Sequence, residues 1–207
     1  MSLSLDATAL RTALPRWCAA LDAAAPELNA LDARLGDGDL GTTLQRCAAN
    51  LTALLDAAAP AGETPGALFK ACAQACAKAS GSSFGTLLAV AFLTVAKQLG
   101  DATVITGAAL PRLLEDVAAA LSARGGAQAG DKTMIDAVLA VAAALRTAAA
   151  DADAPALAAA ARAAAAQAVA DFSGRPNRIG RARMFAERSV GLADPGMVAV
   201  QRMVEAL

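Results

Sequence analysis

Histidine and tyrosine are absent from this sequence of 207 residues, and tryptophan occurs once. Histidine is the commonest general base of enzymes and the commonest protein ligand of metals. Its absence excludes a Ser-His-Asp triad, a Cys-His dyad and a histidine-ligated zinc site. Any catalysis by this chain therefore has to use carboxylates, cations, backbone amides or a bound ion.

The chain also lacks a strong excess of charge and a long apolar run. Its net charge is −1, whereas a nucleic-acid partner would require a basic patch. The longest apolar run, residues 85–96, ends at Lys97, and a transmembrane helix needs about 20 apolar residues. The N-terminus carries Asp6 and has no basic region typical of a signal peptide. We therefore expect a cytoplasmic protein that binds neither nucleic acid nor membrane.

Alanine is abundant, and the hydrophobic fraction reaches 57%. Alanine has the highest helix propensity, and its thin side chain permits close packing of helices. Apolar residues recur at the helical spacing i, i+3, i+4, i+7 between residues 44 and 55, and no segment alternates with a period of two. We therefore predict an all-α fold without strands. Residues 1–207 are expected to form a single antiparallel barrel or bundle of about eight helices.

Prolines and glycines divide the helices. Proline favours the first turn of a helix, so helices are predicted to begin at Pro26, Pro65, Pro155 and Pro195. The first of these is expected to run to about residue 35. Pro15 lies inside a helical stretch, which it is expected to kink or interrupt. The segment 84–95 is apolar nearly all round and is therefore predicted to form a buried helix.

The four cysteines lie in or beside alanine-rich helical stretches; they are Cys18, Cys47, Cys72 and Cys76. Cys72 and Cys76 are one helical turn apart, a spacing that would also suit a pair of ligands for a soft metal. Small buried thiols in a reducing compartment are the favoured interpretation, because free cysteine is among the most buried residue types.

A glycine-rich acidic loop follows the first predicted helices. It brings Asp32, Asp37 and Asp39 within eight residues, with Asp32 near a helix end and the other two alternating through a tight turn. Three carboxylates at close range repel one another, and a hard divalent cation relieves that repulsion. A solvated acidic turn is the alternative. The position of Asp32 and the threonines that open the next helix favour a metal site.

A glycine- and serine-rich loop at residues 79–86 opens the apolar helix. Its residues 81–85 match the G-x-S-x-G pattern of hydrolases, but that mechanism requires a histidine. Free backbone amides and hydroxyls at a helix start suit a phosphate group. A plain helix cap by one of the serines is the alternative, and the two roles are compatible.

Two further loops have mainly structural interpretations when each is taken alone. In the loop at 130–136, Asp131 and Thr133 are predicted to cap a helix, and Lys132 is predicted to be a solvated charge. In the loop at 180–196, three arginines on a short helix can neutralise phosphates, and Asp194 precedes a predicted helix start. Together with the acidic and glycine-serine loops, they supply the parts of a metal–nucleotide site.

In this order, the four stretches resemble the nucleotide-binding L subunit of the dihydroxyacetone kinase family. The same domain forms the C-terminal half of ATP-dependent, single-chain dihydroxyacetone kinases. The resemblance covers nearly the whole chain and rests on residues 31–39, 79–86, 130–134 and 180–196. It implies a barrel of about eight antiparallel helices that binds ADP or ATP and two Mg²⁺ ions at one end.

The resemblance also implies which residues form the site. The two Mg²⁺ ions would be held by Asp32, Asp37 and Asp39. The phosphates would be contacted by Leu40, Gly41, Thr42, Thr43, Ala79 and Ser80. The remainder of the nucleotide would be lined by Gly125, Met134, Arg181, Asp194, Pro195 and Gly196, among which Arg181 is the candidate catalytic residue.

By the same resemblance, the activity is transfer of a phosphoryl group to dihydroxyacetone or a related small ketose. That substrate is attached to a histidine of a separate K-type subunit, and in some members a phosphohistidine phosphocarrier subunit rephosphorylates the bound nucleotide. A chain without histidine fits this division of labour. Leu40 and Leu192 stand where the family has histidine, and residues 77–78 replace a Gly-Gly pair. These departures favour the alternative of a non-catalytic, ADP-binding regulatory module of the same fold.

Overall fold

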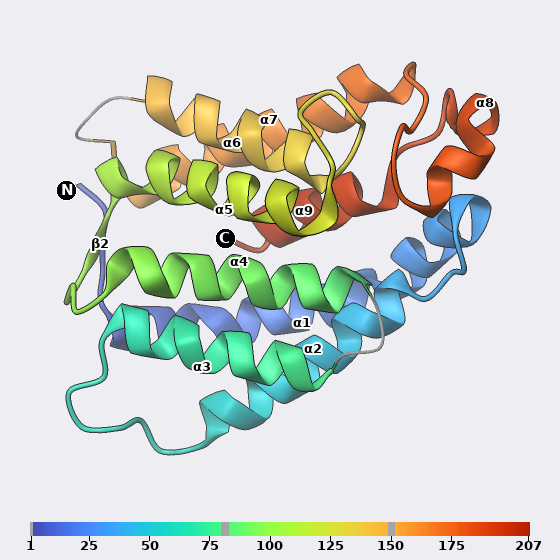
Figure 1. Cartoon of the computed structure of the whole chain (residues 1–207). Helices are drawn as coiled ribbons and strands as arrows, with labels where there is room; N and C mark the ends of the chain where they lie inside the picture. Colours follow the sequence, from blue (N-terminus) through green and yellow to red (C-terminus); the bar gives the residue numbers. More distant parts are fainter. Residues whose placement is uncertain (1, 80–82, 149–151) are drawn as a thin grey trace.

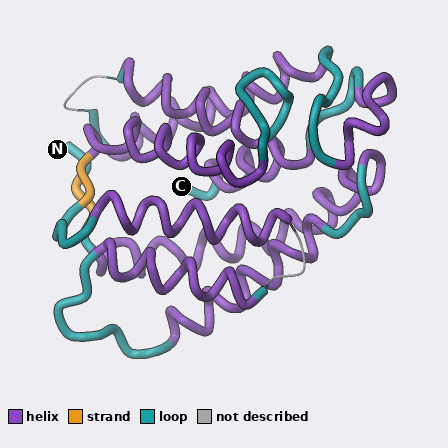
Figure 2. Tube along the Cα trace, viewed as in Figure 1, coloured by secondary structure: helices purple, strands orange, loops and turns teal. Residues whose placement is uncertain are grey.

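Helices form most of the chain, as the alanine-rich pattern predicts (Figures 1 and 2). The computed structural model describes residues 2–79, 83–148 and 152–207, apart from the side chains of Arg181 and Phe185. These ranges contain nine α-helices, of which eight are eleven residues or longer. The predicted all-α fold of about eight helices is therefore confirmed. None of the helices in these ranges combines the length and the apolarity that crossing a membrane requires.

The long helices have the following bounds: α1 Ala7–Leu35, α2 Leu40–Asp56, α3 Pro65–Lys78, α4 Ser83–Leu99, α5 Leu110–Gly125, α6 Met134–Thr147, α7 Ala154–Ser173 and α9 Pro195–Glu205. The short elements are the strands β1 Ser4–Leu5 and β2 Ile105–Thr106, the 3-10 helices η1 Gly107–Ala109 and η2 Arg181–Phe185, and helix α8 Ala186–Ser189.

Three of the four predicted proline starts are confirmed. Pro65, Pro155 and Pro195 lie in the first turns of α3, α7 and α9. Each of these helices has a side-chain N-cap, supplied by Thr64, Asp153 and Asp194 respectively. A proline in the first turn gives up no intrahelical hydrogen bond, because the first amides of a helix have no partner there.

The expected helix start at Pro26 is wrong, and Pro15 does not interrupt the helix in which it lies. Both prolines lie inside α1, which runs through 29 residues. A proline removes one backbone hydrogen bond from a helix, but tertiary packing of an apolar face provides most of the stability of a helix in a protein. Helix α1 has such a face, which includes the buried residues Leu14, Leu21 and Leu28.

The prediction of no strands is also wrong, because the structure contains one pair of short strands. Strands β1 and β2 pair antiparallel, with Ser4 opposite Thr106 and Leu5 opposite Ile105. Strands of two residues are too short to show an alternating pattern in the sequence. The pairing holds the N-terminal segment beside the connection that precedes α5 (Figure 2).

The long helices form a closed ring. Each one packs against the next along the chain, and α9 packs against α1. Two groups of buried side chains fill the interior, one mainly from α1–α4 and one mainly from α5–α7 and α9. Helix α4 lies between the other helices of the two groups (Figure 1). Its partly buried Phe84 packs against both groups.

Helix α4 is less buried than its apolar sequence predicts. Gly85, Leu88, Phe92 and Ala96 are its buried residues, whereas Leu93 is 38% exposed. A member of a ring has an outer face, and the exposed residues of α4 are Ser83, Leu93, Lys97 and Gln98. The expectation that the cysteines are small buried thiols is confirmed, because all four are free and buried.

Glycine allows α2 to begin very close to α1. A Cβ atom added at Gly41 would overlap the carbonyl oxygen of Ala25. The first turn of α2 therefore packs backbone against backbone with the middle of α1. This contact fixes where the acidic loop between the two helices begins and ends.

We expect the substitution Gly41→Ala to lower the free energy of unfolding by about 1–3 kcal/mol, because the added methyl group forces α1 and α2 apart. Gly174→Ala is the matched control, since a Cβ there meets no atom within 4 Å. The control should stay within about 0.5 kcal/mol of the parent in denaturant unfolding. Equal stability of the two variants would contradict the close packing of α1 and α2.

Candidate metal and nucleotide site

The antiparallel ring brings the connections after α1, α5 and α7 and the start of α4 to one end of the molecule. These segments belong to the four stretches that break the alanine pattern in the sequence, of which residues 80–82 lie outside the described residues. In an antiparallel arrangement every second connection returns to the same end. Segments as distant as residues 32 and 196 therefore line one cavity.

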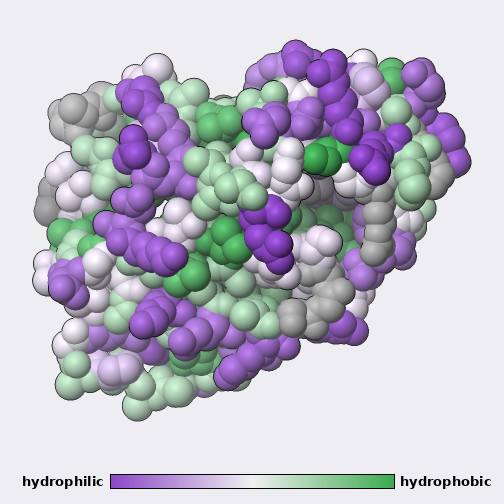
Figure 3. All heavy atoms as spheres, in the orientation of Figure 1, coloured by the Kyte–Doolittle hydropathy of each residue, from purple (hydrophilic) through white to green (hydrophobic). Residues whose placement is uncertain are grey.

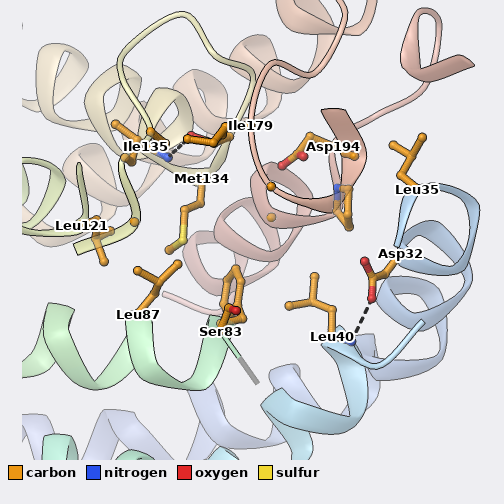
Figure 4. A pocket seen from close by; sticks show the side chains of 18 of the residues that line it. Asp32, Leu35, Leu40, Ser83, Leu87, Leu121, Met134, Ile135, Ile179 and Asp194 are labelled. Carbon is orange, nitrogen blue, oxygen red and sulfur yellow. Dashed lines mark hydrogen bonds between the residues drawn. The ribbon is translucent and has the colours of Figure 1, made fainter. Parts of the chain in front are cut away.

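The cavity has a volume of about 960 Å³, which suits a ligand of nucleotide size. Figure 3 shows a recess on one face of the molecule, with hydrophobic side chains at its floor. Contributions come from the α1–α2 loop, the start of α4, the end of α5, the start of α6, the segment 179–184 and the start of α9. Figure 4 shows side chains from these elements pointing toward one another.

Three carboxylates converge at one side of this cavity. Ligand oxygens of Asp32, Asp37 and Asp39 lie within 4.8 Å of one another. Asp32 is half-buried, and the other two carboxylates are exposed. Carboxylate oxygens are the ligands that Mg²⁺ and Ca²⁺ prefer, so the donor set fits a hard divalent cation. The arrangement agrees with the convergence predicted from the sequence.

Backbone amides hold Asp32 in place. Its Oδ2 atom accepts hydrogen bonds from the amides of Asp39, at 3.0 Å, and Leu40, at 3.3 Å (Figure 4). Asp39 occupies the N-cap position of α2 without a side-chain cap, so Asp32 performs that role from the preceding helix. A Cβ atom at Gly36 would overlap Oδ1 of Asp32, which explains why the loop has glycine there.

The other side of the cavity is apolar. Leu87, Leu121, Met134 and Ile179 lie there, away from Asp32 (Figure 4). A cavity with one apolar and one acidic side fits a ligand with a flat apolar ring and an anionic group. The anionic group would need a cation between itself and the carboxylates, because like charges repel.

Asp194 caps helix α9 at the wall of the cavity. Its Oδ1 accepts from the amide of Met197 and its Oδ2 from the side-chain amide of Asn177, both at 2.8 Å. Only 8% of Asp194 is exposed. Burial raises the pKa of this carboxyl from 3.8 to about 6, although the hydrogen bonds and the nearby Lys132 favour the charged form. The predicted helix start is confirmed here.

The predicted roles of the 130–136 loop are only partly correct. Thr133 caps α6 and forms a capping box with Asp136. Asp131 caps no helix, because its carboxylate accepts from the amide of Gln128 within the loop. Lys132 is not a solvated charge, since it is completely buried. Its long side chain reaches backbone carbonyls that are distant in sequence, which local patterns cannot reveal.

Six of the twelve remaining residues that the resemblance named also line the cavity: Leu40, Gly125, Met134, Asp194, Pro195 and Gly196. Gly41, Thr42, Thr43 and Ala79 lie outside its lining. Thr42 exchanges two hydrogen bonds with Asn29, and Thr43 is buried beside Gly85. Ala79 borders a separate shallow hollow. Ser80 lies outside the described residues, as does the side chain of Arg181, whose backbone begins η2.

Several lining residues were not singled out from the sequence. Arg124 and Ile179 each directly precede a glycine of the predicted loops, and Leu87 follows one turn after the start of α4. For Arg124 and Ile179, the position next to a loop glycine is the sequence signal that could have identified them. Arg183, one of the three predicted arginines, also lines the cavity.

Residues 34–207 match the family model described as the DAK2 domain. The chain belongs to the DAK2 domain family. This DAK2 domain is 34% identical over 183 residues to D-erythrulose kinase of Mycolicibacterium smegmatis, covering 87% of this chain and 31% of that protein. It spans about a third of the length of the first curated relatives that it matches.

Two further comparisons extend along most of the DAK2 domain. The chain is 28% identical over 181 residues to the Escherichia coli protein named PEP-dependent dihydroxyacetone kinase, ADP-binding subunit DhaL, covering 87% of this chain and 85% of that subunit. It superposes with a TM-score of 0.74 and 25% identity on the crystal structure of the C. freundii dihydroxyacetone kinase in complex with AMP-PNP and Mg²⁺. That likeness covers 100% of this chain and 34% of the other.

The raised pKa of Asp194 predicts a pH-dependent stability of the DAK2 domain. The folded carboxyl keeps its proton up to about pH 6, whereas the unfolded one loses it near 3.8. The contribution of Asp194 to the free energy of unfolding therefore falls as the pH rises through 6. Compared with Asp194→Asn, which can also cap the helix, the parent should lose about 1 kcal/mol between pH 5 and pH 7.

Urea unfolding of the two proteins at both pH values measures this difference. All other titrating groups are common to both proteins, so the difference isolates residue 194. A difference that stays constant between the two pH values would show that the buried carboxyl is charged throughout this range.

Proposed function

We propose that this DAK2 domain binds ADP or ATP with two Mg²⁺ ions and serves as the nucleotide-binding part of a dihydroxyacetone kinase. The observation that carries the proposal is the convergence of Asp32, Asp37 and Asp39 at one side of a cavity whose other side is apolar. The neighbouring crystal structure contains AMP-PNP and Mg²⁺, which supports the same ligand class here.

The nucleotide would bind with its base among Leu87, Leu121 and Met134 and its phosphates toward the carboxylates. The bound Mg²⁺ supplies charge neutralisation between the phosphates and the aspartates. Arg124 and Arg183 also line the cavity and add positive charge there. Arg181 begins η2 between lining residues Gly180 and Ala182, which supports its proposed role at the transferring phosphoryl group.

The phosphoryl acceptor would be dihydroxyacetone or a related small ketose held by a K-type subunit. This chain has no histidine, so it has no group that could hold a ketose in the way the resemblance implies. The erythrulose kinases that it matches are about three times as long as the matched segment. The rest of those chains has room for a separate substrate-binding region.

The phosphoryl donor has two candidates. A phosphohistidine phosphocarrier subunit would recharge bound ADP if the chain acts as a separate subunit, as the name of the E. coli relative indicates for that protein. Free ATP would serve if the chain acts as part of a longer kinase of the erythrulose type. Both donors require the same Mg²⁺–nucleotide site.

A non-catalytic, ADP-binding regulatory module is the second candidate function. It is favoured by Leu40, a buried apolar residue that lines the cavity directly beside Asp39. An apolar side chain there adds no proton donor or positive charge for phosphoryl transfer. Measurement of turnover with a partner subunit distinguishes the two functions.

The cluster of three carboxylates predicts that ADP stabilises the protein only together with Mg²⁺. A ligand at a hundred times its dissociation constant adds about 2.7 kcal/mol to the free energy of unfolding. We expect Asp37→Asn to remove this Mg²⁺-dependent rise in melting temperature. Asp101→Asn, at an exposed carboxylate in the turn after α4 and therefore at the other end of the ring, should retain it. An ADP effect of equal size in EDTA and in Mg²⁺ would refute the proposed metal site.

If this chain binds the nucleotide and a K-type subunit binds the ketose, the purified chain alone should not phosphorylate dihydroxyacetone. Addition of a K-type subunit should start turnover, followed as phosphorylated ketose formed with ATP or with the phosphocarrier. The same mixture with Asp37→Asn is the control and should be inactive. Turnover by the chain alone would refute the need for a partner, and nucleotide binding without turnover in any mixture would favour the regulatory module.

A further inference from the structure

One wall of the cavity is a long connection with little regular structure. Residues 174–194 join α7 to α9 and contain only η2 and the short helix α8. Ile179, Gly180 and Arg183 of this connection line the cavity. The position of these residues relative to a bound nucleotide therefore depends on what holds the connection in place.

A single buried ammonium group links the start of the connection to helix α8 within it. The Nζ atom of Lys132 donates to the carbonyl oxygens of Ser173 at 3.2 Å, Arg175 at 2.7 Å and Ser189 at 2.8 Å. Ser173 ends α7 and Ser189 ends α8, so the ammonium joins the two ends of the segment 173–189. The amide of Gly191 also donates to Ser173, at 2.8 Å.

The backbone of Lys132 is joined to the start of α9 as well. Its carbonyl oxygen accepts at 2.9 Å from the side-chain amide of Asn177, which also donates to Asp194 at 2.8 Å. Lys132 has a φ of 62°, the only positive φ of a non-glycine residue among the described ranges. Such a conformation persists where surrounding contacts enforce it. The next residues, Thr133 and Met134, line the cavity.

Lys132 thus contacts the α7–α9 connection directly, is linked to Asp194 through Asn177, and precedes Thr133 in the chain, without lining the cavity itself. It is 0% exposed, and its side chain points into the protein and away from the ligand space. A cation that is buried against backbone carbonyls fixes those carbonyls strongly, because an unpaired buried charge is very unfavourable.

We propose that Lys132 is a positioning residue that sets nucleotide affinity by holding the segment 174–191 against the cavity. The proposal rests on the proposed nucleotide site. Without the ammonium, the segment would populate open arrangements that cannot bind. The apparent dissociation constant would then rise by the factor by which the binding-competent fraction falls.

The substitution Lys132→Met tests the proposal, with Arg11→Met as the matched control. Arg11 is also a largely buried cation that donates to backbone carbonyls, those of Leu55 and Ala57, and it lies at the opposite end of the ring. Both variants should lose stability. Only Lys132→Met should weaken binding of ADP in saturating Mg²⁺, by at least tenfold in isothermal titration, whereas Arg11→Met should stay within threefold of the parent.

Limited digestion with trypsin measures whether the segment opens locally, because general destabilisation would accelerate cleavage elsewhere in the chain as well. The segment contains cleavage sites after Arg178, Arg181, Arg183 and Arg188. In Lys132→Met, cleavage at these sites should accelerate at least tenfold without faster cleavage after Arg112, and ADP with Mg²⁺ should slow it again. In Arg11→Met, cleavage at these sites should match the parent.

The outcomes separate this inference from the proposed function. Affinity within threefold of the parent, or unchanged cleavage in the segment, would overturn the role of Lys132. Failure of the parent to bind ADP would overturn the proposed function, while the cleavage comparison would still decide whether Lys132 holds the segment. If Lys132→Met does not fold, Lys132→Gln takes its place, because its side-chain amide can still donate to a carbonyl oxygen but carries no charge and is too short to reach all three carbonyls.

Discussion

Helix α9 packs against α1 and so closes the ring of long helices within the described chain. Its side chains serve both halves of the interior, because Val198 packs with the α1–α4 group whereas Met197 and Val200 pack with the other. Outside this apolar contact, Arg202 donates two hydrogen bonds to Glu27 of α1. The site depends on this closure, since the residues that begin α9 must return to the end of the molecule where α1 ends.

Closure of the ring also surrounds the acidic loop with surfaces of different chemistry. The three aspartates alone would repel one another, and the backbone amides of Asp39 and Leu40 stabilise Asp32 directly. The ring places an apolar surface and arginines on the other sides of the same cavity. A ligand with a base, phosphates and metal ions therefore complements all sides at once, whereas a free metal ion would complement only one.

Local signals were sufficient for much of the fold and of the site. Helix propensity, N-caps and prolines predicted the all-α fold and the starts of α3, α7 and α9, and the spacing of Asp32, Asp37 and Asp39 predicted their convergence. Errors arose where tertiary contacts outweigh local preference. Packing of the apolar face of α1 overrides the helix-ending tendency of Pro26, and distant carbonyls bury Lys132. The pairing of β1 with β2 is likewise a contact between segments about a hundred residues apart.

The distribution of intrinsic spectroscopic and chemical probes follows from the two-part interior. The single tryptophan, Trp17, stacks edge-on against Phe92, with ring centroids 5.9 Å apart. All four cysteines lie on α1, α2 and α3, in the same half of the ring. Tryptophan fluorescence and thiol labelling therefore both report on that half. A partial unfolding confined to α5–α7, which carry much of the apolar side of the cavity, would leave both signals unchanged and would have to be detected by circular dichroism, by amide hydrogen exchange or by a probe introduced there.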